Sequence, residues 1–193
     1  PTQLLWERYL NDVEKSYDLQ KHPAVVFRSD RSRWNDRTME ITDSKNTYFR
    51  NERKDAFYAF FRHGLCYIKA CYKCPYREKS AADIRIGDYW GPRFQHDHEG
   101  VSMVIANSLN GIDIINQLSI IGNASFQEFA LEEYWSVQFP YNRPRPLFYD
   151  DLLKDLKDPN KSLSAIRAEY CSAFELREKM SRVKHAVKTR LGR

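Results

Sequence analysis

The sequence predicts an α+β fold (α/β-like): a mixed sheet with flanking helices, one β-hairpin and a C-terminal helical tail. Strand patterns alternate with helical patterns along most of the 193 residues. Two short strand patterns flank the polar loop 43–46, which predicts the hairpin. A long stretch with the periodicity of a helix, in which apolar residues recur every three or four positions, occupies roughly the last thirty residues. The 42% hydrophobic and 14% aromatic content, with only 7 Gly and 8 Pro, excludes disordered and collagen-like chains.

The first third of the chain carries clear helix boundaries. Thr2 is a candidate cap for the first helix, and His22-Pro23 prevents it from continuing. Asp55 can cap an aromatic helix that Gly64 closes in a left-handed conformation. The elements expected here are a helix over 2–17, a buried strand over 24–27, hairpin strands over 39–42 and 47–50, and a helix over 56–63.

The remainder of the chain continues the alternation. The strand pattern over 101–107 is more continuously apolar than the pattern over 82–87, so we expect it to be buried on both faces. Asn110-Gly111 predicts a turn, and Gly122 ends the next helix. Further elements are expected as strands over 82–87 and 125–129 and helices over 112–121, 148–157 and 163–191, with Pro140, Pro144 and Pro146 in an irregular connection. We divide the chain into a domain over 1–150 and a helical, basic tail over 151–193.

The net charge of +5 is concentrated at the C-terminal end. Seven basic residues and one acidic residue lie between 177 and 193, so the rest of the chain is close to neutral. Met180, Val183, Val187 and Leu191 form one apolar stripe in this basic helix. Such a helix either packs on its own domain or docks on an anionic membrane or an acidic partner. Nucleic-acid binding is disfavoured because aromatic residues do not interleave with the basic ones.

The four cysteines divide into a close pair and two others. Cys71 and Cys74 form a Cys-x-x-Cys pair, whose thiolates can reach one metal ion or cluster. Cys66 and Cys171 lie in apolar surroundings that favour buried structural thiols. A structural zinc site and a redox-active dithiol are the alternatives for the pair. The candidates for additional ligands are Cys66, Cys171, His63, His96 and His98.

A second candidate site follows the strand pattern over 82–87. Two glycines four residues apart would let a flat ring or a phosphate approach the backbone, with carboxylates beside the turn and aromatic stacking faces within it. The alternative is a tight turn at the strand end whose carboxylates cap local N–H groups. The candidate cofactor-binding residues are Asp83, Gly87, Asp88, Tyr89, Trp90 and Gly91.

Three segments together resemble one known family. They are Cys71-Tyr72-Lys73-Cys74-Pro75-Tyr76, Ala82-Asp83-Ile84-Arg85-Ile86-Gly87-Asp88-Tyr89-Trp90-Gly91 and Gly100-Val101-Ser102-Met103-Val104. In this order, with Trp6-x-x-Tyr9-Leu10 before them and Asn142 after them, they resemble the C-terminal domain of the coenzyme F-420 hydrogenase/dehydrogenase beta subunit. The resemblance covers most of residues 1 to about 150. In detail the sequence is similar to the bacterial branch of this family, which is found beside polysaccharide-biosynthesis genes.

The resemblance implies an electron-transfer domain of an iron-sulfur flavoprotein oxidoreductase. Its flavin, FAD or FMN, would pass electrons between a four-iron four-sulfur cluster and a second acceptor. Cys71 and Cys74 would supply part of the cluster's ligands. Family members carry a ferredoxin-like region upstream, so we expect this chain to be N-terminally truncated and to need that region or a redox partner protein. No catalytic residue is assigned.

The rival hypothesis is a non-catalytic module that has lost its cofactors. It would serve a polysaccharide-assembly complex and dock through the basic residues of 177–193. No apolar run approaches the roughly 18 residues needed to cross a bilayer, and the mean hydropathy is −0.70. We therefore expect a cytoplasmic protein, with peripheral attachment at the inner membrane as a further option through the tail.

Overall fold

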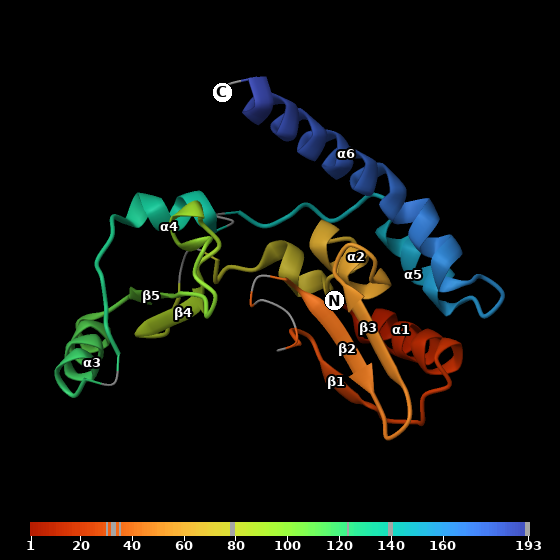
Figure 1. Ribbon diagram of the computed structural model, residues 1–193, viewed down its shortest axis with the longest axis horizontal. Coiled ribbons are helices and arrows are strands. Elements are labelled where there is room, and N and C mark those ends of the chain that lie inside the picture. The colour runs from red at the N-terminus through yellow and green to blue at the C-terminus, as the bar shows by residue number, and fades with distance from the viewer. Residues whose placement is uncertain are drawn as a thin grey trace. The chain divides into compact units, whose positions relative to one another are not determined.

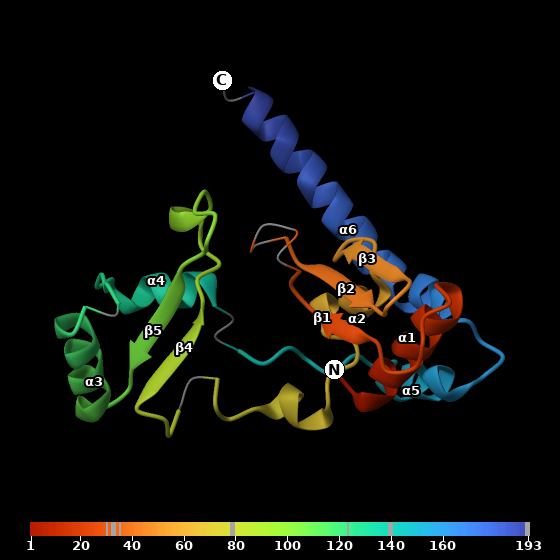
Figure 2. The same cartoon turned by 60° about the horizontal axis from the view of Figure 1, so that its bottom comes forward.

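The computed structural model describes residues 1–29, 31, 34, 36–77, 80–122, 124–138 and 141–191 (Figures 1 and 2). The chain divides into two compact units. Unit 1 contains Pro1–Ser32, Asp36–Lys69 and Pro144–Arg193, and unit 2 contains Arg33–Asn35 and Ala70–Arg143. The described residues form helices and two small antiparallel sheets, which confirms the α+β class.

Unit 1 joins a three-stranded sheet to helices from both ends of the chain (Figure 1). Its elements are α1 (Gln3–Ser16), β1 (Ala24–Val26), β2 (Thr38–Thr42), β3 (Thr47–Asn51), α2 (Ala56–His63), α5 (Tyr149–Lys157) and α6 (Leu163–Leu191). The sheet order is β1-β2-β3, and Thr42 pairs with Thr47 at the hairpin end, as the polar loop predicted. β1 is less buried than expected, because both Ala24 and Val26 are exposed on an outer strand of this sheet.

The predicted helix caps of unit 1 are confirmed. The Thr2 hydroxyl accepts a hydrogen bond from the Leu5 N–H at 3.3 Å. The Asp55 carboxylate accepts from the Tyr58 N–H at 2.8 Å, and Gly64 ends α2 with φ 68°. Each cap satisfies backbone groups that the helix itself leaves without a partner.

The core of unit 1 collects side chains from every layer. Leu5 of α1, Ile41 of β2, Phe60 of α2, Leu152 of α5 and Ile166 of α6 are all fully buried in one cluster. Burying such a side chain stabilises the fold by roughly 1.5–3 kcal/mol. Helices α5 and α6 therefore complete the core that begins with α1.

A fully buried carboxylate links three elements of unit 1. Asp55 accepts hydrogen bonds from the hydroxyls of Tyr9, at 2.6 Å, and Tyr48, at 2.8 Å, besides capping α2. Burial raises the pKa of Asp55, and it also raises the pKa of both tyrosines. These hydrogen bonds offset the free-energy cost of burying the Asp55 carboxylate, which would be strongly destabilising without partners.

Unit 2 is built on a two-stranded sheet. Its elements are the 3₁₀-helix η1 (Lys69–Lys73) where it begins, β4 (Ile84–Asp88), the 3₁₀-helix η2 (Pro92–Phe94), β5 (Ser102–Ala106), α3 (Leu109–Ile120) and α4 (Leu131–Val137). β4 and β5 pair antiparallel, with Ile86 opposite Val104. Among its described residues the buried hydrophobic side chains are those of Tyr72 and Tyr89.

Several expectations for the sheets need correction. The strands form two antiparallel sheets where the sequence suggested one mixed sheet, because each set belongs to a different unit. β5 is half-buried at best, whereas its apolar sequence predicted burial on both faces. Residues 125–129 belong to no strand.

The helices of unit 2 also differ from expectation. Asn110 and Gly111 lie in the first turn of α3, because Ser108 caps that helix by accepting from the Gly111 N–H at 3.2 Å. Helix α4 was not predicted. Among the helices of the described chain, none combines the length and apolar character that a membrane span requires.

Candidate functional site

The four cysteines occupy two different environments. Cys66 and Cys171 are buried in the core of unit 1, and the Thr2 hydroxyl lies 3.0 Å from the Cys66 sulfur. Burial raises the pKa of Cys66 and raises that of Cys171 to about 12. Because the thiolate is the form that binds metals, these two cysteines are structural, as the apolar sequence around them predicted.

Cys71 and Cys74 are partly exposed free thiols in unit 2. Cys71 lies within η1, and Cys74 is the first residue after it. The two cysteines are thus separated by two residues at the end of a short helix, the spacing that lets two thiolates reach one centre. The intervening Tyr72 is buried and anchors this short helix.

Polar side chains hold the backbone of residues 71–77, here called the cysteine loop. Asn142 donates a hydrogen bond to the carbonyl oxygen of Cys74 at 2.9 Å, and Arg77 donates to the Asn142 side chain at 2.9 Å. Arg85, on β4, donates to the carbonyl oxygens of Tyr76 at 2.6 Å and Arg77 at 2.7 Å. The guanidinium groups of Arg77 and Arg85 therefore lie at this loop, and their positive charges favour a negatively charged group beside it.

The second candidate site is spread along β4. Asp83 precedes the strand, Gly87 and Asp88 lie inside it, and the chain turns only at Gly91, before η2. A strand of five residues spans about 17 Å. Asp83 and Gly91 consequently lie at opposite ends of β4, and the six predicted residues do not converge on one point.

Asp83 supports the start of α3. Its backbone carbonyl accepts from the Asn107 N–H at 2.8 Å, and its carboxylate accepts from the hydroxyl of Ser108, the cap of α3. The carboxylate thus contacts the hydroxyl of a residue 25 positions along the chain, whereas the alternative interpretation assigned it to local N–H groups.

Tyr89 belongs to a polar network that sequence reasoning missed. Its hydroxyl donates to Glu133 of α4 at 2.7 Å, and Arg93 forms two hydrogen bonds to the same carboxylate, at 2.9 and 2.8 Å. Desolvation and Glu133 together raise the pKa of Tyr89, and the Arg93 and Tyr89 hydrogen bonds lower that of Glu133. The acidic first turn of α4 was the sequence signal for this helix.

The two glycines of the segment have different surroundings. A Cβ on Gly91 would lie 2.6 Å from Cγ1 of Val137 and closer still to the Tyr89 ring. At Gly87 the nearest atom is the terminal methyl carbon of Met103, at 4.0 Å. Gly91 therefore serves internal packing, while half-buried Gly87 has room for a Cβ in ordinary contact with Met103.

Trp90 presents the exposed aromatic surface of the segment. Its ring stacks on Trp34, with centroids 5.2 Å apart and an interplanar angle of 29°, and 38% of the residue is exposed. The Trp34 indole N–H donates to the carbonyl oxygen of Asp97 at 3.0 Å. Gly100, with φ 83°, leaves room for the Trp34 ring. One face of Trp90 is therefore already occupied.

The described residues do not hold a complete cluster site by themselves. A four-iron four-sulfur cluster takes four thiolates. Within the described ranges no group of three or more His, Cys, Asp or Glu side chains could hold a metal ion. Cys71 and Cys74 form the half-set that the sequence predicted, and Cys66 and Cys171 do not complete it, because both are buried in core packing.

The comparison with protein families assigns the chain to a class, the beta-subunit-like domains of oxidoreductases. A family model described as coenzyme F420 hydrogenase/dehydrogenase, beta subunit (C terminus), matches residues 7–131. This is more than half of the chain, so the chain belongs to that family. The match includes the cysteine loop, β4, β5 and α3. Searches of curated proteins and of solved structures found no match.

Proposed function

We propose that this chain is the C-terminal electron-transfer domain of an iron-sulfur flavoprotein oxidoreductase, in which Cys71 and Cys74 supply two ligands of a four-iron four-sulfur cluster. The single observation that carries the proposal is the sorting of cysteines within a member of this family: two thiols are accessible and two are buried. The remaining ligands come from a ferredoxin-like region or from a redox partner protein.

The proposal assigns the flavin, FAD or FMN, to the exposed part of the segment around β4. Gly87 and Trp90 are the residues that it would contact, because Gly87 has no crowding side chain around its Cα and Trp90 is exposed. Asp83, Tyr89 and Gly91 support this surface through the contacts of α3 and α4. Asp88 pairs with Ser102 in the strand, next to Gly87. A bound flavin would supply reversible electron transfer.

The cellular setting rests on the resemblance alone. Similarity to the bacterial branch supports a role in polysaccharide biosynthesis. Together with the basic tail, it supports a cytoplasmic protein with peripheral attachment at the inner membrane. Neither setting is needed for the tests below.

Thiol titration tests the sorting of the cysteines. In the folded chain we expect Cys71 and Cys74 to react with a thiol reagent, while Cys66 and Cys171 react only after denaturation, because burial both shields them and raises their pKa. A Cys71→Ser/Cys74→Ser variant should lose the fast reaction. Fast reaction of all four thiols in the folded chain would contradict the structural role of the core pair.

Iron binding tests the ligand assignment. The purified chain is incubated anaerobically with ferrous iron, sulfide and excess 2-mercaptoethanol, whose thiolates can occupy the ligand positions that this chain does not fill, and bound iron is measured after gel filtration. We expect iron bound to the wild-type chain to fall to background in Cys71→Ser/Cys74→Ser and to persist in Cys66→Ala, a control that removes a thiol outside the site. Equal iron content in the wild type and the double variant, including none in both, would overturn the assignment.

The second candidate function is the non-catalytic docking module. It is supported by the half-set of ligands in the described chain and by the exposed distal part of α6. Removing residues 177–193 separates the two functions. Lost association with a partner or membrane, with no thiol-dependent iron binding in either form, would favour the docking module.

A further inference from the structure

Helix α6 has two halves with different surroundings. In the first half, Leu163, Ile166 and Cys171 are fully buried, and Tyr170 and Phe174 are partly buried against the core of unit 1. At about 100° per residue these positions lie on one side of the helix. This side holds α6 on unit 1.

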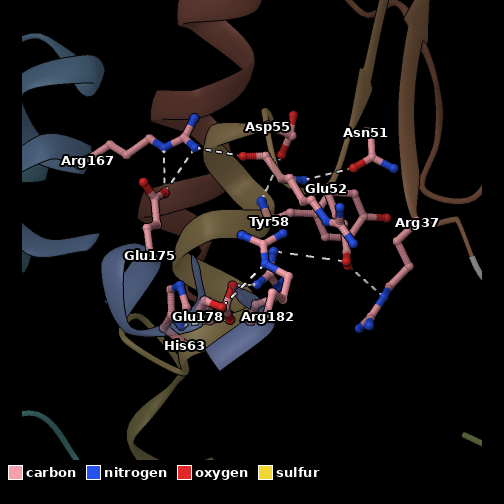
Figure 3. Close-up of polar contacts among 12 residues, drawn as sticks. Arg37, Asn51, Glu52, Asp55, Tyr58, His63, Arg167, Glu175, Glu178 and Arg182 are labelled. Carbon is pink, nitrogen blue, oxygen red and sulfur yellow. Dashed lines mark hydrogen bonds and ion pairs between the residues drawn. The ribbon is translucent and has the colours of Figure 1, made fainter. Parts of the chain in front are cut away.

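Glu178, near the middle of α6, still contacts the rest of unit 1. Its carboxylate accepts from the guanidinium of Arg62, near the end of α2. It also lies 3.7 Å from Nδ1 of His63, the last residue of that helix (Figure 3). Burial opposes ionisation, but the hydrogen bond and charge of Arg62 lower the pKa of Glu178. Beyond this ion pair the helix runs on past α2 (Figure 1).

The apolar stripe of the distal half is not a continuation of the packing side. Leu176, Met180, Val183 and Val187 are exposed by 58%, 52%, 57% and 49%. Their direction lies roughly 130° around the helix from the buried residues of the first half. The packing side itself continues as Ser181, which is polar and exposed. Packing within unit 1 therefore does not account for the stripe.

The spacing of the stripe is that of a coiled-coil seam. Its residues recur at intervals of four, three and four, which places them at the a and d positions of a heptad. Arg177, Lys179 and Lys184 then occupy the flanking e and g positions, and all three are exposed. A second copy would bring like charges together across the seam, so the charges disfavour self-association.

We propose that the distal half of α6, residues 176–187, docks against an acidic amphipathic helix of a partner protein and forms a short coiled coil with it. Glu or Asp at the partner's e and g positions would pair with the basic flanks of the seam. A membrane-surface helix usually has a broad apolar face with aromatic anchors. This stripe is narrow and contains Leu, Met and Val only, which favours a helix over a lipid surface.

The test uses the full chain and two designed peptides as probes. Both peptides have four heptads with Leu at a and d, one with Glu and the other with Lys at e and g. We expect the chain to bind the Glu peptide at least about tenfold more tightly than the Lys peptide, in a titration followed by fluorescence anisotropy. Binding should weaken with added salt, because exposed charge pairs are screened.

Two variants on neighbouring residues separate the seam from general electrostatic attraction. Met180→Asp places a charge in the seam and should abolish binding, whereas Ser181→Asp adds the same charge outside the seam and should retain most of it. Both sites are exposed, so circular dichroism should show the wild-type fold. Equal losses in the two variants would overturn the proposal in favour of unspecific attraction.

Charge reversal gives the sharpest outcome. The triple variant Arg177→Glu/Lys179→Glu/Lys184→Glu should prefer the Lys peptide, because the flanking pairs are then inverted. Seam-dependent binding to vesicles containing phosphatidylserine, without binding to the Glu peptide, would overturn the proposal, as would Met180-dependent self-association in sedimentation. None of these readouts depends on iron or flavin, so failure here leaves the proposed redox function untouched.

Discussion

Units 1 and 2 are held together in different ways. All but two of the buried hydrophobic residues in the described chain belong to unit 1. Large apolar residues are exposed in both units, but in unit 2, where Ile86 is exposed by 69%, Leu109 by 78% and Ile120 by 83%, the buried hydrophobic residues of the described chain are only Tyr72 and Tyr89. Unit 1 is therefore stabilised by its core, whereas unit 2 depends on strand pairing and polar contacts.

The candidate site lies in the unit with the smaller core. Arg85 and Asn142 hold the cysteine loop, and Glu133 connects α4 to Tyr89. Such hydrogen bonds are directional, so they fix where groups point while contributing less to stability than core burial does. Regions with few buried contacts open most readily, and binding loops are commonly drawn from them.

The largest expected effect comes from truncating the core of unit 1. Phe60→Ala should lower the free energy of unfolding by about 3–5 kcal/mol, because a fully buried ring leaves a cavity. Ile120→Ala, on the exposed side of α3, should change it by no more than about 0.5 kcal/mol. Urea unfolding followed by circular dichroism measures both. A comparable loss in Ile120→Ala would mean that α3 is covered in solution, and the contrast between the units would fail.

A pair of glycine variants sharpens the description of unit 2. Gly91→Ala should destabilise the protein by about 1–3 kcal/mol, because its methyl group would overlap Val137 and the Tyr89 ring. Gly87→Ala meets no such obstacle and should unfold like the wild type. If flavin approaches the backbone at Gly87, the bulkier Gly87→Leu should weaken binding of added FMN or FAD, measured by flavin fluorescence. Unchanged flavin binding in folded Gly87→Leu would remove this residue from the proposed contact.

A smaller effect is expected from the buried carboxylate of unit 1. Burial raises the pKa of Asp55 above its ordinary value of 3.8, so the folded state binds this proton more tightly than the unfolded state does. Its contribution to stability is present below about pH 4 and is lost as pH rises through the raised pKa, by about 1.4 kcal/mol for each tenfold gain in proton affinity on folding. Between pH 4 and 7 the wild type should therefore lose stability relative to Asp55→Asn in urea unfolding.

Glu178 provides a control of opposite sign for this measurement. Arg62 lowers its pKa, so its contribution is present above the unfolded value and is lost as pH falls. The wild type should gain stability relative to Glu178→Gln as pH rises from 4 to 7. The same pH trend in both variants would show that neither carboxyl group controls the difference.

Local signals predicted much of unit 1 and little of the organisation of unit 2. The caps at Thr2, Asp55 and Gly64 act within one helical turn, so a short stretch of sequence contains the whole interaction. The segment 125–129 was interpreted as a strand because a short sequence pattern does not show whether a neighbouring strand is present. α4 was missed because it is short and has no side-chain cap hydrogen bond.

The candidate site shows the same limit. The pairing of Cys71 with Cys74 and the structural role of Cys66 and Cys171 could be predicted, because spacing and apolar neighbours are visible in the sequence. The continuation of β4 to Asp88 could not, since it depends on the pairing of Asp88 with Ser102 in β5. The sequence pattern suggested a turn where the pairing with β5 keeps the chain extended.

By itself the sequence determined the helix caps, the hairpin, the family and the accessible pair of thiols. The tertiary structure alone decided that Tyr9 and Tyr48 satisfy Asp55, that Asn142 holds Cys74 and that the distal stripe of α6 faces away from its packing side. The physical reason is the distance along the chain between the residues that interact. Caps and turns join residues three or four positions apart, whereas Cys74 and Asn142 are 68 residues apart and meet only once the chain has folded.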